Sequence, residues 1–214
     1  MKNLIIIGAG GFGREVLEIA LDIQEQKKDT PWRVKGFITD IPGDFHEKDT
    51  LGYTILGDIK NHIVSSDNVY AFAIANISFK MKTTRDFLSQ GAEFVTLIHP
   101  TAVIGRTVKI GIGSIISPRA TVTANVSVGS FVRIGGGTSV GHDVNIGDYS
   151  TISGTCGING YAKIGKGAFL ASHVAICPHA EVGNFASVGA GSVVLRKVKD
   201  DTHVFGVPAK KLNL

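Results

Sequence analysis

The chain has 214 residues, of which 43% are hydrophobic, and it carries a formal net charge of +4. It can bury a core, but no stretch approaches the ~20 apolar residues of a membrane-spanning helix, so we expect no membrane insertion and a cytoplasmic location. The scattered positive charge argues against nucleic-acid binding, and two cysteines, Cys156 and Cys177, are too few for a disulfide or zinc framework.

Residues 1–98 alternate between strand and helix patterns. Strands are expected at residues 3–8, 33–40, 68–76 and 93–98, and helices at residues 12–26 and 78–91. Gly91 is expected to end the second helix. This order predicts a small parallel sheet flanked by helices, a Rossmann-like α/β domain.

A glycine-rich segment, GAGGFG at residues 8–13, joins the first strand to the first helix. It fits the pattern G-x-G-x-x-G, in which glycines allow a tight turn and the helix N-terminus attracts phosphate. The motif alone fits a dinucleotide equally well. A hydride-transferring enzyme, however, would need a larger cofactor domain and a substrate domain of its own.

Residues 99–214 follow a period of six. An aliphatic residue recurs at sixteen positions from Ile104 to Val194 without exception, and glycine follows it in nine of these hexads. The residue four positions after it is always Ala, Ser, Thr, Val or Cys. A period of six excludes an amphipathic helix and predicts three short strands per coil, with aliphatic side chains stacked inside and glycines relieving the corners. We expect a parallel β-helix of just over five coils without projecting loops.

Several segments together resemble the bacterial sugar acetyltransferases of the hexapeptide class. They are IIIGAGGFGREV at the N-terminus, LIHPTAVIG at the junction, VGHDVNIGDY at residues 140–149, and VGAGSVVLRKV and VFGVPAKKL near the C-terminus. That family includes sialic acid O-acetyltransferases and N-acetyltransferases of nucleotide-linked 4-amino sugars. The resemblance covers essentially the whole chain. It implies a left-handed β-helix, acetyl-CoA as acyl donor without a metal, a nucleotide-sugar site in residues 1–98, and a homotrimer with active sites between neighbouring β-helices.

The resemblance assigns catalysis to His142 and Asp143. The family's catalytic histidine stands in a Gly-His-Asp/Glu motif, and His142 and Asp143 match it. Because imidazole takes up a proton near neutral pH, His142 would be the general base for attack on the thioester, and Asp143 would orient the ring. Direct transfer in a ternary complex is then expected. The alternative is that His142 only caps a turn.

The resemblance also implies the ligand contacts. For acetyl-CoA these fall on Thr151, Ala171, Ser172, Gly189 and Ala190. For the nucleotide sugar they fall on Gly8, Ala9, Gly10, Gly11, Phe12, Asp40, Ala75 and Asn76. Small residues would let the pantetheine arm approach closely, although tight corner packing explains them equally well. Asp40 would bond the base or the ribose, or else it is an ordinary strand-end turn residue.

Three positions depart from the family pattern. Many relatives have histidine where this chain has Phe12 and a second histidine where it has Thr151, and some have asparagine near Gly135. The second histidine lies beside the acetyl group in those relatives. Because this chain has Thr151 instead, the resemblance does not determine which residues contact the acetyl group or which acceptor is acetylated.

Two other classes of function compete with acetyl transfer. Carbonic-anhydrase-like enzymes also have a three-sided hexapeptide β-helix, here called the prism, and bind a metal through three histidines of adjacent subunits. His173 and His179, however, stand at a different hexad position from His142 and are expected to be exposed corner residues. An inactive scaffold would have no need of a proton acceptor at His142. We therefore predict an N-acetyltransferase of a nucleotide-linked amino sugar, with 4-amino sugars favoured, for surface-glycan biosynthesis. A sugar O-acetyltransferase of the sialic acid type is the alternative.

Overall fold

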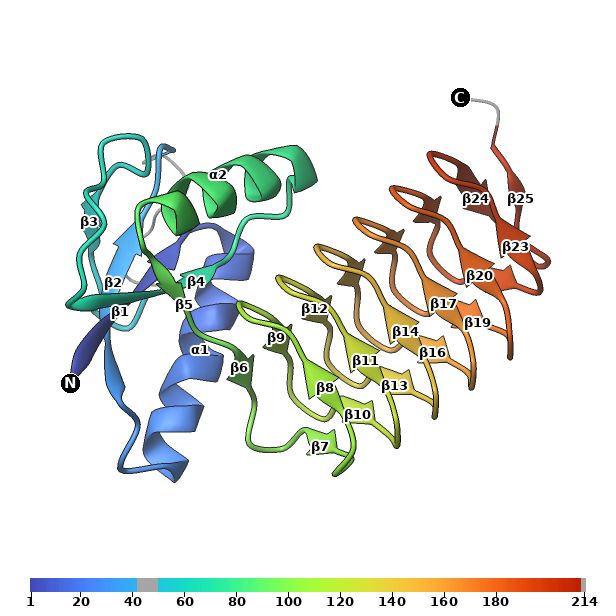
Figure 1. Cartoon of the computed structure of the whole chain (residues 1–214), viewed down its shortest axis with the longest axis horizontal. Coiled ribbons are helices and arrows are strands. Elements are labelled where there is room, and N and C mark those ends of the chain that lie inside the picture. Colours follow the sequence, from blue (N-terminus) through green and yellow to red (C-terminus); the bar gives the residue numbers. More distant parts are fainter. Residues whose placement is uncertain (42–49, 213–214) are drawn as a thin grey trace. The chain divides into compact units, whose positions relative to one another are not determined.

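The structure is a computed structural model, and it describes residues 1–41 and 50–212. The chain divides into two compact units, Met1–Pro100 and Thr101–Leu214 (Figure 1). From the sequence we place the boundary after residue 98. The functions expected for the two domains stay predictions.

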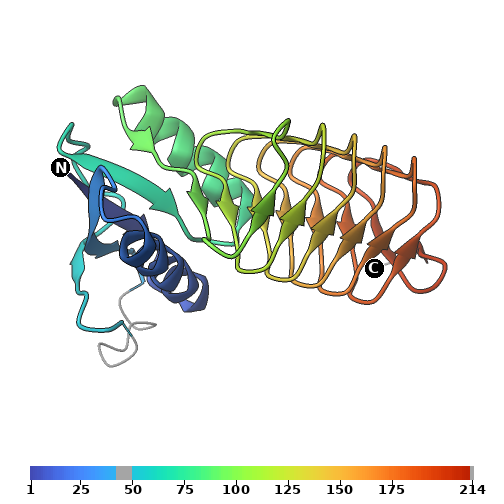
Figure 2. The ribbon, with the colours of Figure 1, turned by 90° about the horizontal axis from the view of Figure 1, so that it is seen from below.

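The first unit contains a five-stranded parallel sheet in the order β3-β2-β1-β4-β5. Its strands are β1 (Lys2–Ile7), β2 (Trp32–Ile38), β3 (Ile55–Gly57), β4 (Asn68–Phe72) and β5 (Glu93–Phe94), and its helices are α1 (Gly11–Gln26) and α2 (Ile77–Ser89). The chain moves from β1 to β2 in one direction and from β4 to β5 in the other, so right-handed crossovers put the two helices on opposite faces (Figure 2). The central β1 is buried along its apolar run, as parallel strands covered on both faces require.

The structure differs from the expected strands of this unit in three places: one strand was not expected, and two expected strands have other bounds. We did not expect β3, because its three residues include exposed Leu56 and carry no alternating pattern. The strand expected at residues 93–98 is instead two short strands, β5 and β6 (Leu97–Ile98), and β6 does not belong to the five-stranded sheet. β4 ends at Phe72 rather than at residue 76, because Asn76 already caps the following helix.

The second unit is a left-handed β-helix with three parallel faces, visible as stacked coils in Figure 2. The first face contains β7 (Val103–Ile104), β10 (Thr121–Val122), β13 (Ser139–Val140), β16 (Gly157–Ile158), β19 (Ala175–Ile176) and β22 (Val193–Val194). The second contains β8 (Lys109–Ile110), β11 (Ser127–Val128), β14 (Asn145–Ile146), β17 (Lys163–Ile164), β20 (Glu181–Val182) and β23 (Lys197–Val198). The third contains β9 (Ile115–Ile116), β12 (Arg133–Ile134), β15 (Thr151–Ile152), β18 (Phe169–Leu170), β21 (Ser187–Val188) and β24 (His203–Phe205), with β25 (Lys210–Lys211) antiparallel to β24.

The sixfold period is confirmed, because each hexad forms one strand and each strand pairs with the one a coil later, as Val122 does with Val140. The aliphatic side chains are buried from Ile116 to Val194 and half-buried in the first coil. Two further strands, β23 and β24, continue beyond the sixteenth hexad. Lys197 pairs there with Glu181, so the last turn of the coil takes 16 residues instead of 18.

From the sequence we expected the glycines that follow the aliphatic positions to relieve the corners, and this expectation is wrong. The left-handed backbone falls two residues later, at non-glycine residues such as Asn125, Asp143 and Tyr161 as well as at some glycines. A Cβ on Gly147, by contrast, would lie 2.6 Å from the backbone nitrogen of Lys166 in the next coil. Glycine is therefore needed there because the coils stack closely.

Candidate active site

His142 and Asp143 lie in the corner that follows β13, at the edge between the first and second faces. Asp143 takes the left-handed corner position, with φ +57°, and its N–H donates to the carbonyl of Ala124 at 3.0 Å. Aspartate adopts this conformation more readily than most residues because its short polar side chain bonds locally. The corner geometry thus holds the Asp143 carboxylate beside the imidazole of the preceding residue.

The Asp143 carboxylate accepts two hydrogen bonds. Its Oδ2 lies 2.8 Å from His142 Nδ1, and its Oδ1 lies 3.2 Å from Asn125 Nδ2. The hydrogen bonds from His142 and from Asn125 hold the pKa of Asp143 below its ordinary value, so this group is ionised at neutral pH. A carboxylate can only accept, so Nδ1 carries the proton of the neutral ring. The His142 side chain is 57% exposed, and its Nε2 is left as an accessible proton acceptor.

Two residues of the next coil complete the surroundings of the His142 ring. A Cβ on Gly160 would lie 2.8 Å from both Nε2 and Cε1 of His142, so the ring rests where only glycine leaves room. The Tyr161 ring stands almost perpendicular to the imidazole, at 88° with centroids 5.1 Å apart. We did not predict Asn125, Gly160 or Tyr161 from the sequence. The 18-residue coil spacing was the signal, because neighbours of residues 142 and 143 lie 18 positions before and after them.

The expected acetyl-CoA contacts lie at another edge of the solenoid. Ala171 and Ser172 follow β18, and Gly189 and Ala190 follow β21 one coil later, so all four lie between the third and first faces. Thr151 lies on the third face, at the start of β15. Within one chain the structure therefore groups these residues near one another but not with His142. A Cβ on Gly189 would lie 2.5 Å from the Phe205 ring, which gives this glycine a packing reason as well.

The glycines of the GAGGFG segment have two different environments. Gly8 has φ +107°, and a Cβ there would lie 2.6 Å from Ile74, while a Cβ on Gly13 would overlap the Gly8 carbonyl. These two positions need glycine for the turn and for helix packing. A Cβ on Gly10 or on Gly11 would meet nothing within 4 Å, and α1 begins there without a side-chain cap. Space is therefore open at Gly10 and Gly11, at the helix N-terminus between Ala9 and Phe12.

Asp40 and Asn76 both have structural tasks. Asp40 Oδ1 accepts hydrogen bonds from the backbone N–H groups of Ile59 at 2.9 Å and Lys60 at 3.2 Å. Asn76 caps α2 by accepting the Phe79 N–H at 2.9 Å, beside the exposed Ala75. Asp40 also lines a pocket of about 220 Å³. Ligand contacts by these residues stay predictions.

That pocket contains a histidine that we did not predict. His62 Nε2 lies 2.9 Å from the Tyr70 hydroxyl, and burial lowers the pKa of His62, so its ring is neutral at pH 7. Lys60 and Lys82 also line the pocket. It therefore combines two carboxylates, of Asp40 and Asp86, with cations and a neutral imidazole next to the end of β2.

Two other histidines of the β-helix, His173 and His179, are exposed at left-handed corners. In residues 1–41 and 50–212, no group of three or more His, Cys, Asp or Glu side chains is arranged to hold a metal ion. No helix in the described part of the chain has the length and apolar character needed to cross a membrane.

Parts of the chain match known proteins in sequence. Residues 3–87 match the PglD N-terminal domain. The GDP-perosamine N-acetyltransferase of Escherichia coli O157:H7 is 30% identical over 116 residues, which are 53% of this chain and 50% of the relative, so the match spans half the length of that curated protein.

Two solved structures resemble the entire chain. The acetyltransferase domain of PglB from Neisseria gonorrhoeae FA1090 is 25% identical with a TM-score of 0.89, over 99% of this chain and 100% of that one. It has also been solved in complex with acetyl coenzyme A. PerB from Caulobacter crescentus, in complex with CoA and GDP-perosamine, is 25% identical with a TM-score of 0.86, over 100% of this chain and 98% of that one.

A Rossmann-like unit followed by a left-handed β-helix, with a histidine–aspartate pair on one edge, defines the class of hexapeptide-repeat folds with an N-terminal α/β domain. By partial sequence matches and by fold over the whole chain, the protein is similar to bacterial sugar acetyltransferases.

Proposed function

We propose that this protein is an acetyl-CoA-dependent N-acetyltransferase that acts on a nucleotide-linked amino sugar. One observation carries the proposal: His142 presents an accessible Nε2 while the ionised Asp143 holds its Nδ1. This is the arrangement that a general base requires. The relatives that act on GDP-perosamine, or bind it, favour an amine over a hydroxyl as the acceptor.

The reaction needs one base and no covalent intermediate on the protein. His142 Nε2 accepts a proton from the sugar amine as its nitrogen forms a C–N bond to the thioester carbonyl. Asp143 stabilises the imidazolium that results. When the C–S bond breaks, the proton passes from His142 to the departing thiolate. Burial raises the pKa of the Cys156 thiol, which argues against Cys156 as an acyl carrier.

The positions of the two groups of site residues support a homotrimer. His142 lies between the first and second faces, whereas Ala171, Ser172, Gly189 and Ala190 lie between the third and first faces. Three prisms around a threefold axis would bring one edge of each chain next to a different edge of its neighbour. In our proposal one chain supplies the base, and its neighbour supplies the main-chain contacts to acetyl-CoA, with Thr151 near the acyl group.

For the nucleotide sugar we propose the carboxyl end of the sheet in the first unit. The open space at Gly10 and Gly11 would admit the diphosphate at the start of α1. Asp40 would contact the base or the ribose from the pocket beside β2, and Ala75 and Asn76 would border the diphosphate. We assign the protein to surface-glycan biosynthesis in the cytoplasm.

The test is thiol release from acetyl-CoA with a panel of GDP-, UDP- and dTDP-linked 4-amino sugars, together with sialic acid and CMP-sialic acid. We expect saturable turnover with an amino sugar and a loss of roughly 10²–10⁴-fold in His142→Asn, which keeps the size and polarity of the side chain. Turnover only with a sialic acid would assign the protein to the sugar O-acetyltransferases of the sialic acid type. Full activity in His142→Asn would refute the mechanism.

Mixed oligomers test the shared site. His142→Asn and Ala171→Trp should each be inactive alone, because one lacks the base and the other blocks the expected acyl-donor groove. If each site joins two chains, random mixing should restore about one quarter of the wild-type activity, since a site then combines an intact edge from each chain. No recovery in a mixture shown by mass to contain both chains would contradict the shared site.

A further inference from the structure

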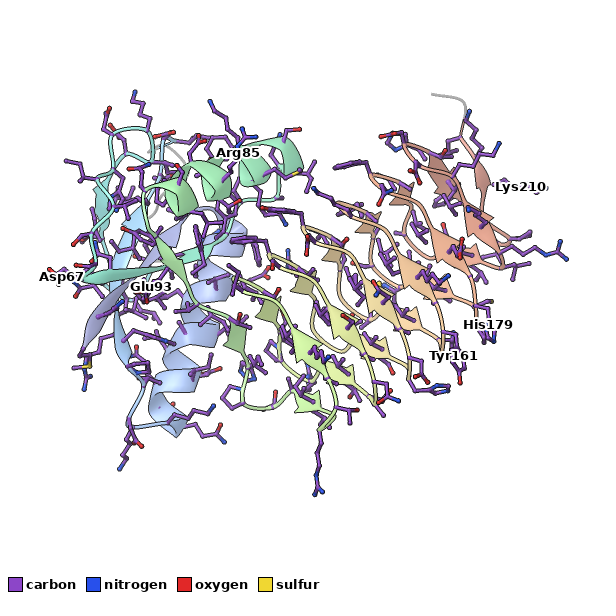
Figure 3. All side chains as sticks on the ribbon, in the orientation of Figure 1. Asp67, Arg85, Glu93, Tyr161, His179 and Lys210 are labelled. Atoms are coloured by element: carbon purple, nitrogen blue, oxygen red, sulfur yellow. The ribbon has the colours of Figure 1, made fainter. Side chains whose placement is uncertain are left out.

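Tyr161 and His179 form an aromatic pair beside His142, on the edge between the first and second faces, and Figure 3 shows them next to each other there. Their rings are stacked, with centroids 4.8 Å apart and an interplanar angle of 4°. Tyr161 meets the His142 ring nearly at a right angle, with centroids 5.1 Å apart. Both separations lie in the range in which aromatic rings attract each other.

The backbone fixes Tyr161 in this place. Its N–H donates to the carbonyl of His142 at 3.0 Å, and it occupies the left-handed corner position with φ +62°. His179 occupies the same corner position one coil later, with φ +61°. The coil spacing therefore stacks the two rings and directs the pair toward His142.

His142 needs such a support. Its side chain is more than half exposed, and a single hydrogen bond from Nδ1 to Asp143 restrains the ring. One hydrogen bond fixes a point on the ring but leaves rotation about it, whereas catalysis needs Nε2 within about 0.5 Å of its productive position. Gly160 bounds the ring on one side, and Tyr161 bounds it on another.

We infer that Tyr161, backed by His179, is a positioning residue that holds the His142 imidazole through its aromatic ring and so directs Nε2 at the acceptor amine. The inference rests on the proposed role of His142 as the base. The contact is made by the ring, so phenylalanine should replace tyrosine, and a residue without a ring should not.

The variant that tests this is Tyr161→Asn, because asparagine removes the ring and suits the left-handed backbone. Tyr161→Phe keeps the ring. The matched control is Tyr149→Asn, because Tyr149 also has a left-handed backbone, with φ +63°, and a stacked ring, Phe131, but lies at another edge. If Tyr161→Asn does not keep the oligomeric mass of the wild type, His179→Asn takes its place, with a smaller change of the same kind.

The first readout needs no substrate. The His142 ring signals in a ¹H–¹³C spectrum, assigned by their absence in His142→Ala, should carry a ring-current shift from Tyr161. We expect them to move in Tyr161→Asn toward the positions of an unrestrained histidine, and to stay in Tyr161→Phe and Tyr149→Asn. Unmoved His142 signals in Tyr161→Asn would overturn the inference, whatever the protein's activity.

The second readout is the single-turnover rate of acetyl transfer to GDP-perosamine, or to the panel sugar that is turned over. We expect Tyr161→Asn to slow the transfer roughly tenfold or more with KM changed less than about threefold, Tyr161→Phe to recover most of the rate, and Tyr149→Asn to match the wild type. A higher KM with an unchanged rate would assign Tyr161 to binding instead and contradict the inference. Full activity of His142→Asn would refute the proposed role of His142 as the base, which is a separate result.

Discussion

Replacing Gly160 by alanine should move the His142 ring without unfolding the protein. The added Cβ would lie 2.8 Å from Nε2 and Cε1 of His142, whereas ordinary contacts begin at 3.4 Å, so the ring has to retreat by about 0.6 Å to reach an ordinary contact. The ring is the exposed end of a flexible side chain, so it can move at little cost in folding free energy. Gly160 also has no positive φ that alanine would strain.

The cost should appear in catalysis instead. A displacement of about 1 Å at a reacting group costs on the order of 10²-fold, so we expect kcat to fall roughly tenfold to a hundredfold, or about 1.4–2.7 kcal/mol. Stability should change by less than about 1 kcal/mol, since Gly-to-Ala replacement also reduces the entropy of the unfolded chain.

The assay is thiol release beside thermal unfolding, with Gly157→Ala as the control. A Cβ at Gly157, in the same coil, would meet nothing within 4 Å, so this variant should keep both rate and stability. Wild-type kcat in a folded Gly160→Ala would show that the position of the ring does not limit the reaction, and our argument about His142 would fail.

Three further predictions concern single features of the β-helix. Asn125→Ala should raise the pKa of Asp143 toward its ordinary value in a ¹³C-carboxyl titration, because one of the two hydrogen bonds that lower it is lost; the stability that the lowered pKa provides is present above the ordinary carboxyl pKa and is lost as pH falls through the native one. An unchanged pKa of Asp143 in Asn125→Ala would show that the hydrogen bond from Asn125 does not lower it. Half-buried Cys177 should react with a thiol reagent before Cys156, whose pKa burial raises, so the Cys177→Ser protein should label only on unfolding; fast labelling of that variant would be inconsistent with a buried Cys156. Ile152→Ala should lower the free energy of unfolding by about 2–5 kcal/mol, because its fully buried side chain leaves a cavity between coils; a loss below about 1 kcal/mol in a denaturation curve would contradict tight stacking.

Some residues of the candidate site could be chosen from the sequence, and others could be found only in the structure. The motif around His142 singles out the histidine and its acidic neighbour as candidates, because they are adjacent in the chain, and their catalytic role stays a prediction. Asn125, Gly160 and Tyr161 surround them from neighbouring coils and carry no local motif. In the sequence, Asp40 could be a strand-end residue or a ligand contact, and Asn76 could be a helix cap or a ligand contact. Their hydrogen bonds in the structure account for the strand-end and capping roles.

By itself, the sequence determined the β-helix. An inward aliphatic side chain every six residues can be buried only if each hexad makes one strand of a repeating coil, and the sixteen aliphatic positions leave no alternative period. It also determined the α/β class of the first unit through its strand and helix patterns.

Only the tertiary structure decided which side chains share an edge. Stacking of coils 18 residues apart brings Asn125, Asp143, Tyr161 and His179 into one column, and puts the expected acetyl-CoA contacts on a different edge from His142. It also decided that the glycines after the aliphatic positions serve close coil contacts and not the left-handed turns. The reason is physical: the hexad pattern fixes which side chains point inward, whereas the neighbours of an outward side chain depend on how successive coils stack.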